Sequence, residues 1–240
     1  MMVTYGRRCQ SAILHIKNGG NKFLRKTPNK TWVKLKKVQQ SKEVIPTKKA
    51  DVTAVIMASG HSSRMQQNKL FLPFQEATFL ERTIQLVQSV GFGKVVLVIK
   101  PEDLVHLKIP KQVVVIENNA SDRGQSASVR LGTAQVEGQG VIFLTADQPL
   151  LTRDILMTLI KKGEVDKIVF PTREAQPATP IFFGSHYFDE LLRVTGDRGG
   201  RQVRDRFPNN WLTFPVASRL LMDVDTPEDY QNLLEESSVT

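Results

Sequence analysis

The segment Ala54–Lys69, AVIMASGHSSRMQQNK, decides the fold of this chain. A short apolar run, Val52–Met57, predicts a buried strand that stops at the small residues Ala58-Ser59-Gly60. Backbone N–H groups at such a strand end can point at an anion, and the cations Arg64 and Lys69 beside them favour a nucleotide triphosphate. The loop holds a single glycine, so it is neither the P-loop nor the three-glycine dinucleotide fingerprint. An ordinary strand-to-loop junction uses the same residue types, so the remaining chain has to decide between the two interpretations.

From Asp51 onward, short β-rich runs alternate with helical patterns. This alternation predicts an α/β protein with a mostly parallel sheet that is covered by helices on both faces. Ligands of such sheets bind at the carboxyl ends of the strands, so we expect the loops after Met57, Ile116, Leu144 and Val224 to converge on one edge. The predicted strands are Val52–Met57, Lys94–Ile99, Gln112–Ile116, Val141–Leu144, Lys167–Phe170, Pro180–Phe183 and Leu220–Val224, and the predicted helices are Phe79–Val90, Ser126–Gln135, a segment from the Thr152 cap through Ile160, Ser185–Val194 and a segment that starts at Thr226.

The basic charge of the chain is confined to its first 50 residues. Residues 1–50 hold 13 of the 33 Lys and Arg and one of the 24 acids, which leaves 20 bases and 23 acids in residues 51–240. We therefore expect residues 1–50 to be a basic, poorly ordered leader and residues 51–240 to form one domain. The alternatives are that the leader contacts nucleic acid, an acidic partner or a membrane surface, or that it is a transit peptide. The acidic balance of the body argues against nucleic-acid binding, and no nucleic-acid partner is expected.

Composition also excludes several classes of protein. No apolar run approaches the roughly 18 residues of a membrane span, and we expect no membrane partner. The single cysteine, Cys9, rules out an intramolecular disulfide and suits a reducing cytoplasm, the location we expect. No cluster of His or Cys with metal-ligand spacing and no G-x-S-x-G elbow is present, so covalent catalysis has no candidate.

Two aspartates follow predicted strands. Asp147 lies in LTADQPLL, and Asp225 lies in DVDTPEDY. Mg²⁺ often takes one or two carboxylates together with phosphate oxygens, so both aspartates are candidate ligands of a nucleotide-bridging Mg²⁺. Asp147 could instead be a turn residue before Pro149, and Asp225 could cap the following helix. Successive strand residues face opposite sides, so at most one of Asp223 and Asp225 should face the site.

Two further loops carry groups that suit phosphate. Gly124, Gln125 and Ser126 stand at a predicted helix start, where free N–H groups can bind a phosphate or the polar edge of a base, although an ordinary helix start looks the same. The loop GDRGGR adds Asp197, Arg198 and Arg201 as candidates for the acceptor phosphate, since Arg suits bidentate contacts with phosphate. Arg204 and Arg206 extend this positive patch, and a salt-bridged surface loop is the alternative.

Taken in order, these segments resemble the molybdenum-cofactor cytidylyltransferase family, within the MobA-like nucleotidyltransferases. The matching pieces are VIMASGHSSRMQQNKLFLPF, NASDRGQSASVRLG, LTADQPLLT, ATPIFFG, TGDRGGRQVRDRF and DVDTPEDY, which span residues 52–230. The resemblance implies a Rossmann-like nucleotidyltransferase fold for residues 51–240, a requirement for Mg²⁺, and transfer of CMP from CTP to the phosphate of molybdopterin cofactor with release of pyrophosphate. It further implies that Arg64 and Lys69 bind the triphosphate, that Asp147 holds the metal, and that Gly124 to Ser126 help form the nucleotide pocket.

The sequence also departs from the family pattern. Gln66 replaces the usual Gly after Arg-Met, and Ala178-Thr179-Pro180 stands where Gly-His-Pro is usual. The Ala58-Ser59-Gly60 opening resembles the cytidylyl branch more than the guanylyl branch. We expect Ser59 to narrow the pocket and to bond the polar edge of a pyrimidine, which favours CTP over GTP.

Three rival functions remain. They are a relative that uses GTP, a nucleotidyltransferase that acts on a sugar or polyol phosphate, and a non-catalytic accessory protein that delivers cofactor to a molybdenum hydroxylase. Intact Lys69 and Asp147 favour catalysis over delivery. A molybdenum hydroxylase apo-enzyme is the expected protein partner.

Overall fold

The computed structural model describes residues 24–26, 32–34, 48–60, 65, 67–105, 107–121 and 124–238. Contacts divide the chain into two units, Met1–Glu43 and Val44–Thr240. The first unit contains an antiparallel strand pair, β1 (Leu24–Lys26) and β2 (Trp32–Lys34). The domain boundary after residue 50 and the poor order of the leader stay predictions. None of the helices in the described ranges is both long and apolar enough to cross a membrane.

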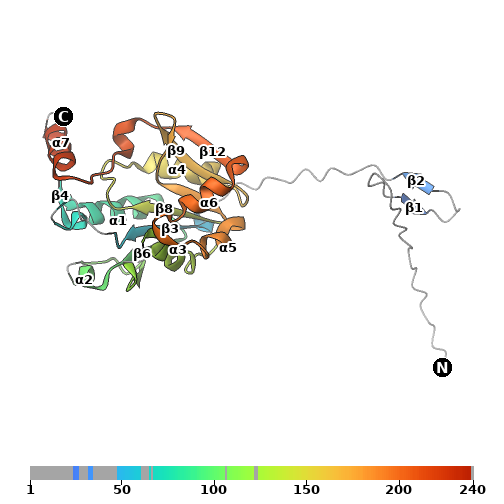
Figure 1. Ribbon diagram of the computed structural model, residues 1–240, viewed down its shortest axis with the longest axis horizontal. Helices are drawn as coiled ribbons and strands as arrows, with labels where there is room; N and C mark the ends of the chain where they lie inside the picture. Colours follow the sequence, from blue (N-terminus) through green and yellow to red (C-terminus); the bar gives the residue numbers. More distant parts are fainter. Residues whose placement is uncertain are drawn as a thin grey trace, which may run out of the picture. The chain divides into compact units, whose positions relative to one another are not determined.

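The second unit is built around one mixed sheet (Figure 1). Its strand order is β10-β9-β11-β8-β3-β6-β7, and β12 pairs with β9. Strands β8, β3, β6 and β7 run parallel, and β11 is antiparallel to both β8 and β9. The strands are β3 (Val52–Ala58), β6 (Lys94–Ile99), β7 (Val113–Glu117), β8 (Gly140–Thr145), β9 (Ile168–Arg173), β10 (Gln176–Pro177), β11 (Ile181–Gly184) and β12 (Trp211–Pro215).

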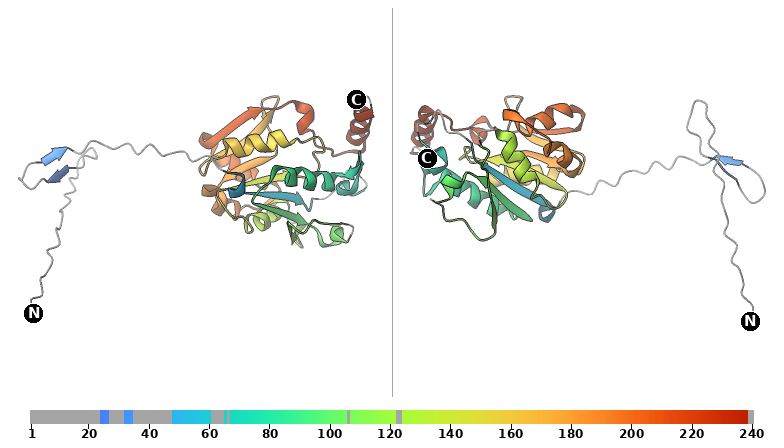
Figure 2. Two further views of the ribbon diagram at one scale, coloured as in Figure 1. Left: turned by 180° about the vertical axis from the view of Figure 1, so that it is seen from behind. Right: turned by 60° about the horizontal axis from the view of Figure 1, so that its bottom comes forward.

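Helices cover both faces of this sheet (Figure 2). Side chains of β3 alternate between the faces, so Ala54 and Ile56 pack in one core cluster and Val55 packs in another. Helices α1 (Phe79–Val90) and α4 (Arg153–Lys162) complete the first cluster, and α3 (Gln125–Thr133), α5 (Phe188–Leu191) and α6 (Arg201–Arg206) complete the second. The predicted α/β class, with a mostly parallel sheet between helices, is confirmed.

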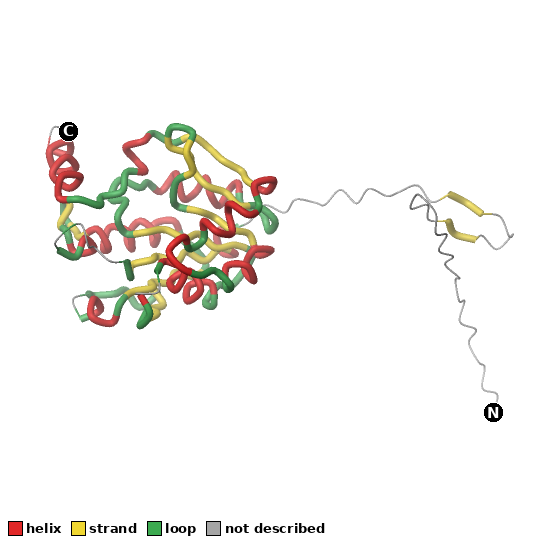
Figure 3. The backbone as a smooth tube through the Cα atoms, viewed as in Figure 1, coloured by secondary structure: helices red, strands yellow, loops and turns green. Residues whose placement is uncertain are grey.

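A third apolar cluster lies beside the carboxyl end of the sheet. It joins Phe74, Phe79, Val224 and Leu233 from β4 (Pro73–Phe74), α1, the following loop and α7 (Pro227–Ser238). The 3₁₀ turn η2 (Lys69–Phe71) and strand β5 (Ala77–Thr78) connect β3 to α1, and α2 (Pro101–Leu104) follows β6 (Figure 3). This cluster fixes the two segments that carry Lys69 and Asp225 at the same edge of the sheet.

Local sequence rules account for the best-predicted helices. Helix α1 has the predicted bounds because Thr78 and Glu81 form a reciprocal capping box and Gly91, at φ +80°, ends the helix. Helix α7 begins where it was predicted, with Pro227 in its first position and hydrogen bonds between Thr226 and Asp229 at its start. Strand β6 was likewise predicted with its observed bounds.

The predicted strand Leu220–Val224 was wrong. The 3₁₀ turn η7 (Ser218–Leu221) occupies its start, and the chain continues across the strand ends without a ladder. Its apolar residues divide between different clusters, with Leu221 in the first and Val224 in the third. The segment is held by a hydrogen bond from the Val224 N–H to the Asp147 carbonyl, so burial of a crossing loop produced the strand-like pattern.

Two further features of the C-terminal third differ from the sequence prediction. The helix predicted at Ser185–Val194 is divided into a 3₁₀ turn, η4 (Ser185–Tyr187), and the four-residue α5, because the Tyr187 side chain is buried and donates a hydrogen bond to the Asp166 carbonyl. Strand β12 was not predicted, since WLTFP is only half-buried and its alternation is weak.

Candidate nucleotide and acceptor sites

A cavity of about 270 Å³ lies at the carboxyl end of the central strands. The end of β3 supplies Ala58, Ser59 and Gly60, and the start of α3 supplies Gly124 and Gln125. Lys69, Asp147, Asp197 and Arg201 also line it. The sequence-predicted nucleotide residues therefore surround one cavity, with two exceptions. Arg64 lies outside the described residues, and Ser126 is fully buried, lines neither this cavity nor the next, and accepts a hydrogen bond from Gln202.

Lys69 is held between the two aspartates that were predicted as metal ligands. Its Nζ lies 2.6 Å from Asp147 Oδ2 and 2.8 Å from Asp225 Oδ1. Burial lowers the pKa of Lys69, but Asp147 and Asp225 outweigh this effect and raise it above its ordinary value. The Lys69 side chain is 17% exposed, so most of it is buried beside the two carboxylates.

The carboxylates beside Lys69 suit a divalent cation. Asp147 Oδ1 is buried and has no hydrogen-bond partner among the described residues, and Asp225 is 49% exposed. Within the described ranges no group of three or more acidic, His or Cys side chains is arranged to hold a metal. Two carboxylates with phosphate oxygens are nevertheless sufficient for Mg²⁺. Burial, followed by the charges of Asp147 and Asp225, raises the pKa of Asp223 to about 6.

Ser59 belongs to a buried polar network. Its Oγ lies 2.6 Å from Ser128 Oγ and accepts a hydrogen bond from Asn118 Nδ2 at 2.9 Å. The residue is 3% exposed. The hydroxyl thus joins β3 to α3 and to the loop after β7, and the expected hydrogen bond from Ser59 to a pyrimidine stays a prediction. The Ser59 side chain still borders the cavity and limits its width.

Gly124 permits the close approach of two loops. Its backbone has φ +80° and ψ −178°, a conformation that side chains rarely allow. A Cβ there would lie 2.1 Å from Asp197 Oδ1 and 2.9 Å from the Gly196 carbonyl oxygen. The glycine thus brings the start of α3 against η5 (Gly196–Arg198). Asp197 consequently lines the first cavity rather than a separate acceptor site.

A second cavity, of about 350 Å³, adjoins the first. Met57, Gln125, Thr145, Asp147 and Arg201 border both. Three arginines and three aspartates line the second cavity, together with polar side chains from loops and aromatic side chains from the sheet. These residues include Arg173, Arg201, Arg204, Asp147, Asp223, Asp225, Gln148, Thr179, Phe143 and Phe183. Asp223 and Asp225 both line the cavity, so the expectation that at most one of them would face the site was wrong, because this segment is not a strand.

The second cavity revises the acceptor residues. Arg201 is in it, but Arg198 points elsewhere and pairs with Asp205 at 2.6 Å, and Arg206 pairs with Glu190. Sequence reasoning missed Gln148, whose Nε2 donates to Thr179 Oγ1 at 2.9 Å and whose Oε1 is buried without a partner in the described part of the chain. The signal that could have revealed Gln148 is its place directly after Asp147, at the same strand end.

The mixed α/β sheet, with small residues after its central strand and carboxylates after the next, is that of a Rossmann-like nucleotidyltransferase. More narrowly, the chain belongs to the MobA-like NTP transferase domain family, whose model matches residues 54–210. Curated relatives include the purine catabolism protein PucB of Bacillus subtilis, 28% identical over 73% of this chain and 92% of that protein. Molybdenum cofactor cytidylyltransferase of Escherichia coli is 24% identical over 75% of this chain and 93% of its own length. A probable molybdenum cofactor guanylyltransferase of Trichormus variabilis is 29% identical over 75% of this chain and 88% of its own.

Solved structures show the same fold. Rv0371c of Mycobacterium tuberculosis has a TM-score of 0.70 and 26% identity, with 78% of this chain and 100% of that chain covered. A structure of that protein in complex with manganese has a TM-score of 0.65, and covers 77% of this chain and 98% of that one. The nucleotidyl transferase Mth528 of Methanothermobacter has a TM-score of 0.66 at 19% identity, covers 77% of this chain and 96% of that chain, and supports the fold alone.

Proposed function

We propose that this protein transfers CMP from CTP to the phosphate of molybdopterin cofactor and releases pyrophosphate, with Mg²⁺ as the metal. The observation that carries the proposal is the pair of adjoining cavities, which share Asp147 and Arg201. A two-substrate transfer needs such a junction, because the acceptor oxygen has to approach the α-phosphorus of the nucleotide in line. The curated relatives that act on molybdenum cofactor support the choice of acceptor.

Asp147 and Asp225 are the residues that would hold Mg²⁺. Asp147 Oδ1, which is buried and has no partner among the residues that the structure describes, is the feature that fits a hard cation. When bound, the metal would supply positive charge next to the triphosphate. The solved structure of Rv0371c in complex with manganese supports a divalent metal for this chain.

Lys69 and Arg201 would supply the other positive charges for the two substrates. Lys69 lies beside the α3 start and the β3 end, where its ammonium can stabilise charge on the triphosphate and on departing pyrophosphate. Arg201 borders both cavities, so its guanidinium can orient the attacking phosphate. A phosphate oxygen then attacks the α-phosphorus, the bond to the bridging oxygen breaks, and pyrophosphate leaves without a covalent enzyme intermediate. Arg64 stays a predicted partner of the triphosphate.

The preference for CTP rests on the steric part of the Ser59 argument. The Ser59 side chain borders the nucleotide cavity, and its network with Ser128 and Asn118 holds it in place. A serine fixed at this position leaves less room for a purine base than a glycine would. Such steric exclusion supplies about 10-fold discrimination or more in favour of CTP over GTP. Relatives of both the cytidylyl and guanylyl types occur among the matches, so GTP is the second candidate donor.

The test is incubation of the protein with each NTP, Mg²⁺ and molybdopterin cofactor while pyrophosphate release is measured. We expect the highest kcat/KM with CTP. Equal values, or a preference for GTP, would reject the cytidylyl assignment and keep the nucleotidyltransferase one. Tight cofactor binding without pyrophosphate release from any NTP would favour the delivery protein, for which a molybdenum hydroxylase stays the predicted recipient.

A matched pair of variants tests the metal ligands. Asp147→Asn is expected to abolish activity or to raise the Mg²⁺ concentration needed for half-maximal rate, because it replaces a charged ligand with a neutral one. Asp154→Asn, on the exposed first turn of α4, is the control and should leave the Mg²⁺ titration unchanged. An unchanged titration for Asp147→Asn would reduce that residue to a turn former.

A further inference from the structure

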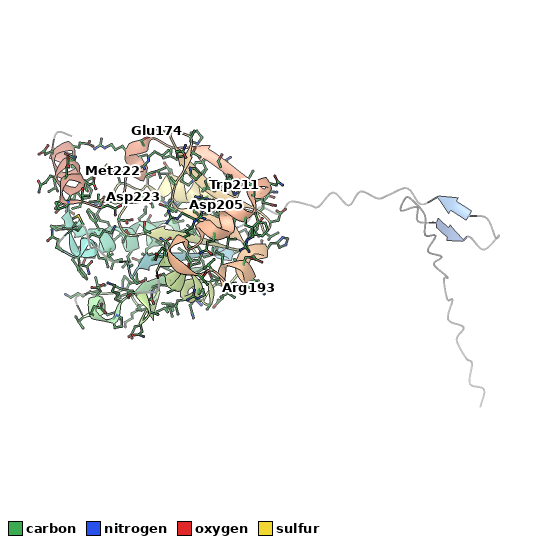
Figure 4. All side chains as sticks on the ribbon, in the orientation of Figure 1. Glu174, Arg193, Asp205, Trp211, Met222 and Asp223 are labelled. Atoms are coloured by element: carbon green, nitrogen blue, oxygen red, sulfur yellow. The ribbon has the colours of Figure 1, made fainter. Side chains whose placement is uncertain are left out.

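Arg204 is a buried arginine in the wall of the second cavity. It lies on α6 and is 9% exposed. Its guanidinium stacks on the Phe170 ring, with 5.4 Å between Cζ and the ring centroid, and its Nε donates to Asp205 Oδ1 at 2.8 Å. The Arg204 carbonyl accepts a hydrogen bond from Trp211 Nε1 at 2.7 Å, which fixes the backbone (Asp205 and Trp211 are labelled in Figure 4). The side chain is therefore held in one orientation.

The outer nitrogens of this guanidinium are free of partners in the described part of the chain. Nη1 and Nη2 of Arg204 make no hydrogen bond with any residue of the described ranges, although the residue lines the second cavity. The pair with Asp205 uses Nε and leaves the outer nitrogens available to a ligand in the cavity that Arg204 lines. A ligand with negatively charged oxygens would complete the set in a bidentate manner.

The position of Arg204 relative to Arg201 separates their roles. The two residues are three apart on α6 and so share one face, with Cβ atoms about 5–6 Å apart. Arg201 borders both cavities, and Arg204 borders only the second. The reacting phosphate has to lie at the junction, because its oxygen must reach the α-phosphorus. Arg204 is therefore one helical turn away from the reacting phosphate and faces another part of the acceptor.

We propose that Arg204 binds a second anionic or metal-oxo group of the acceptor, separate from the phosphate that attacks. The acceptor is then a phosphate monoester that carries another negatively charged oxygen group several ångströms from its phosphate. Arg173, at the end of β9, lines the same cavity and adds positive charge to it. A polyol phosphate with only hydroxyl groups would leave the Arg204 donors unpaired. The proposal rests on the proposed function and deepens it by defining the acceptor class.

The kinetic test compares Arg204→Met with Arg206→Met. Methionine keeps the packing on Phe170 and removes the charge, and Arg206 is an exposed arginine on the same helix that pairs with Glu190. Arg204→Met is expected to raise the KM for molybdopterin cofactor by about 10- to 100-fold, the loss typical of a charge-assisted pair, with the KM for CTP nearly unchanged. Arg206→Met should change neither value. Arg204→Lys keeps the charge without the planar fork and should fall between wild type and Arg204→Met.

Two outcomes would overturn this role. One is an unchanged acceptor KM for both Arg204 variants in folded protein, as judged by circular dichroism. The other is use of glycerol 3-phosphate as acceptor with a kcat/KM equal to that of molybdopterin cofactor. If Arg204→Met does not fold, the comparison of Arg204→Lys with wild type decides.

A binding measurement separates this proposal from the proposed function. Inorganic molybdate is titrated into ¹⁵N-labelled Arg201→Met protein, and the Nε–H resonance of Arg204 is followed by NMR and assigned with an additional Arg204→Lys substitution. Removal of Arg201 ensures that a shift reports the site one turn further along α6. A saturable shift supports the anion site even if no NTP yields pyrophosphate, and the absence of any shift overturns it even if transfer is observed.

Discussion

Replacement of Lys69 by Met tests the arrangement at the centre of the nucleotide site. The variant removes the ammonium that lies 2.6 Å from Asp147 and 2.8 Å from Asp225, and keeps most of the side-chain volume. Two carboxylates beside Asp223 then lose the positive partner that Lys69 supplies. We expect lower stability in addition to a large loss of turnover, whereas an exposed lysine would affect turnover alone.

The size of the effect follows from burial. Exposed ion pairs contribute about 0–1 kcal/mol, and breaking a buried pair costs about 3–5 kcal/mol. The Lys69 and Asp147 side chains are mostly buried and Asp225 is half exposed, which places the expected loss near 2 kcal/mol. For a domain of this size that corresponds to a decrease in Tm of about 4–8 °C.

Urea unfolding in EDTA, followed by circular dichroism, measures this loss. Lys94→Met is the matched control, because Lys94 makes a 2.7 Å pair with Glu137, which is 77% exposed, and should lose no more than about 1 kcal/mol. Adding Asp147→Asn to Lys69→Met should recover part of the stability, since it removes the unpaired charge. A Lys69→Met protein as stable as Lys94→Met, or a double variant that shows simple additivity, would refute the reasoning.

Three further predictions concern the frame of the site. Gly124→Ala should destabilise the protein by about 1–3 kcal/mol and raise the KM for CTP, whereas Gly91→Ala, also at φ +80° but in open space at the end of α1, should destabilise it without affecting KM. Hydrogen bonds from Thr78 lower the pKa of Glu81, so the stabilising effect of Glu81 is present above the pKa of the unfolded state and is lost as pH falls through the lower folded value. The stability difference between wild type and Glu81→Ala, about 1 kcal/mol at pH 7, should therefore vanish in acid. A stability difference that does not depend on pH would contradict this. Deletion of residues 1–47 should leave kcat/KM nearly unchanged and move the pI to the acidic side, and an intact fold with lost activity would make the leader a substrate-binding element.

Local signals were sufficient where one short segment determines its own structure. The capping box and Gly91 fix α1, and the continuous apolar run fixes β6. Prediction failed where burial comes from distant parts of the chain. The loop before α7 shows strand-like apolar residues because it crosses the strand ends, and β12 is held mainly by its parallel pairing with β9. Neither property is present in the segment itself.

In the site, the sequence predicted the position of a residue along the chain better than the direction of its side chain. Asp147, directly after β8, could be predicted because topology alone brings the strand ends together, and Lys69 could be predicted from the loop that follows β3. The direction of a helical side chain depends on rotation about the helix axis, which a spacing of one or two residues changes by 100° or 200°, so Ser126 turned inward and Gln125 turned toward the cavity.

Side-chain direction also explains why Arg198 was predicted to bind the acceptor but does not line the cavity, and why Arg204 was predicted only to extend a positive patch but does line it. Arg198 precedes α6, pairs with Asp205 at the surface and does not line the second cavity. Arg201 and Arg204, three residues apart, point toward the second cavity from a single face of the helix. A patch of positive charge in the sequence is thus resolved into a surface ion pair and two cavity arginines, and only the latter remain available to an acceptor. Arg201 reaches the junction of the two cavities and Arg204 does not. The spacing of these two arginines on α6 therefore sets the length of an acceptor that can bind both of them.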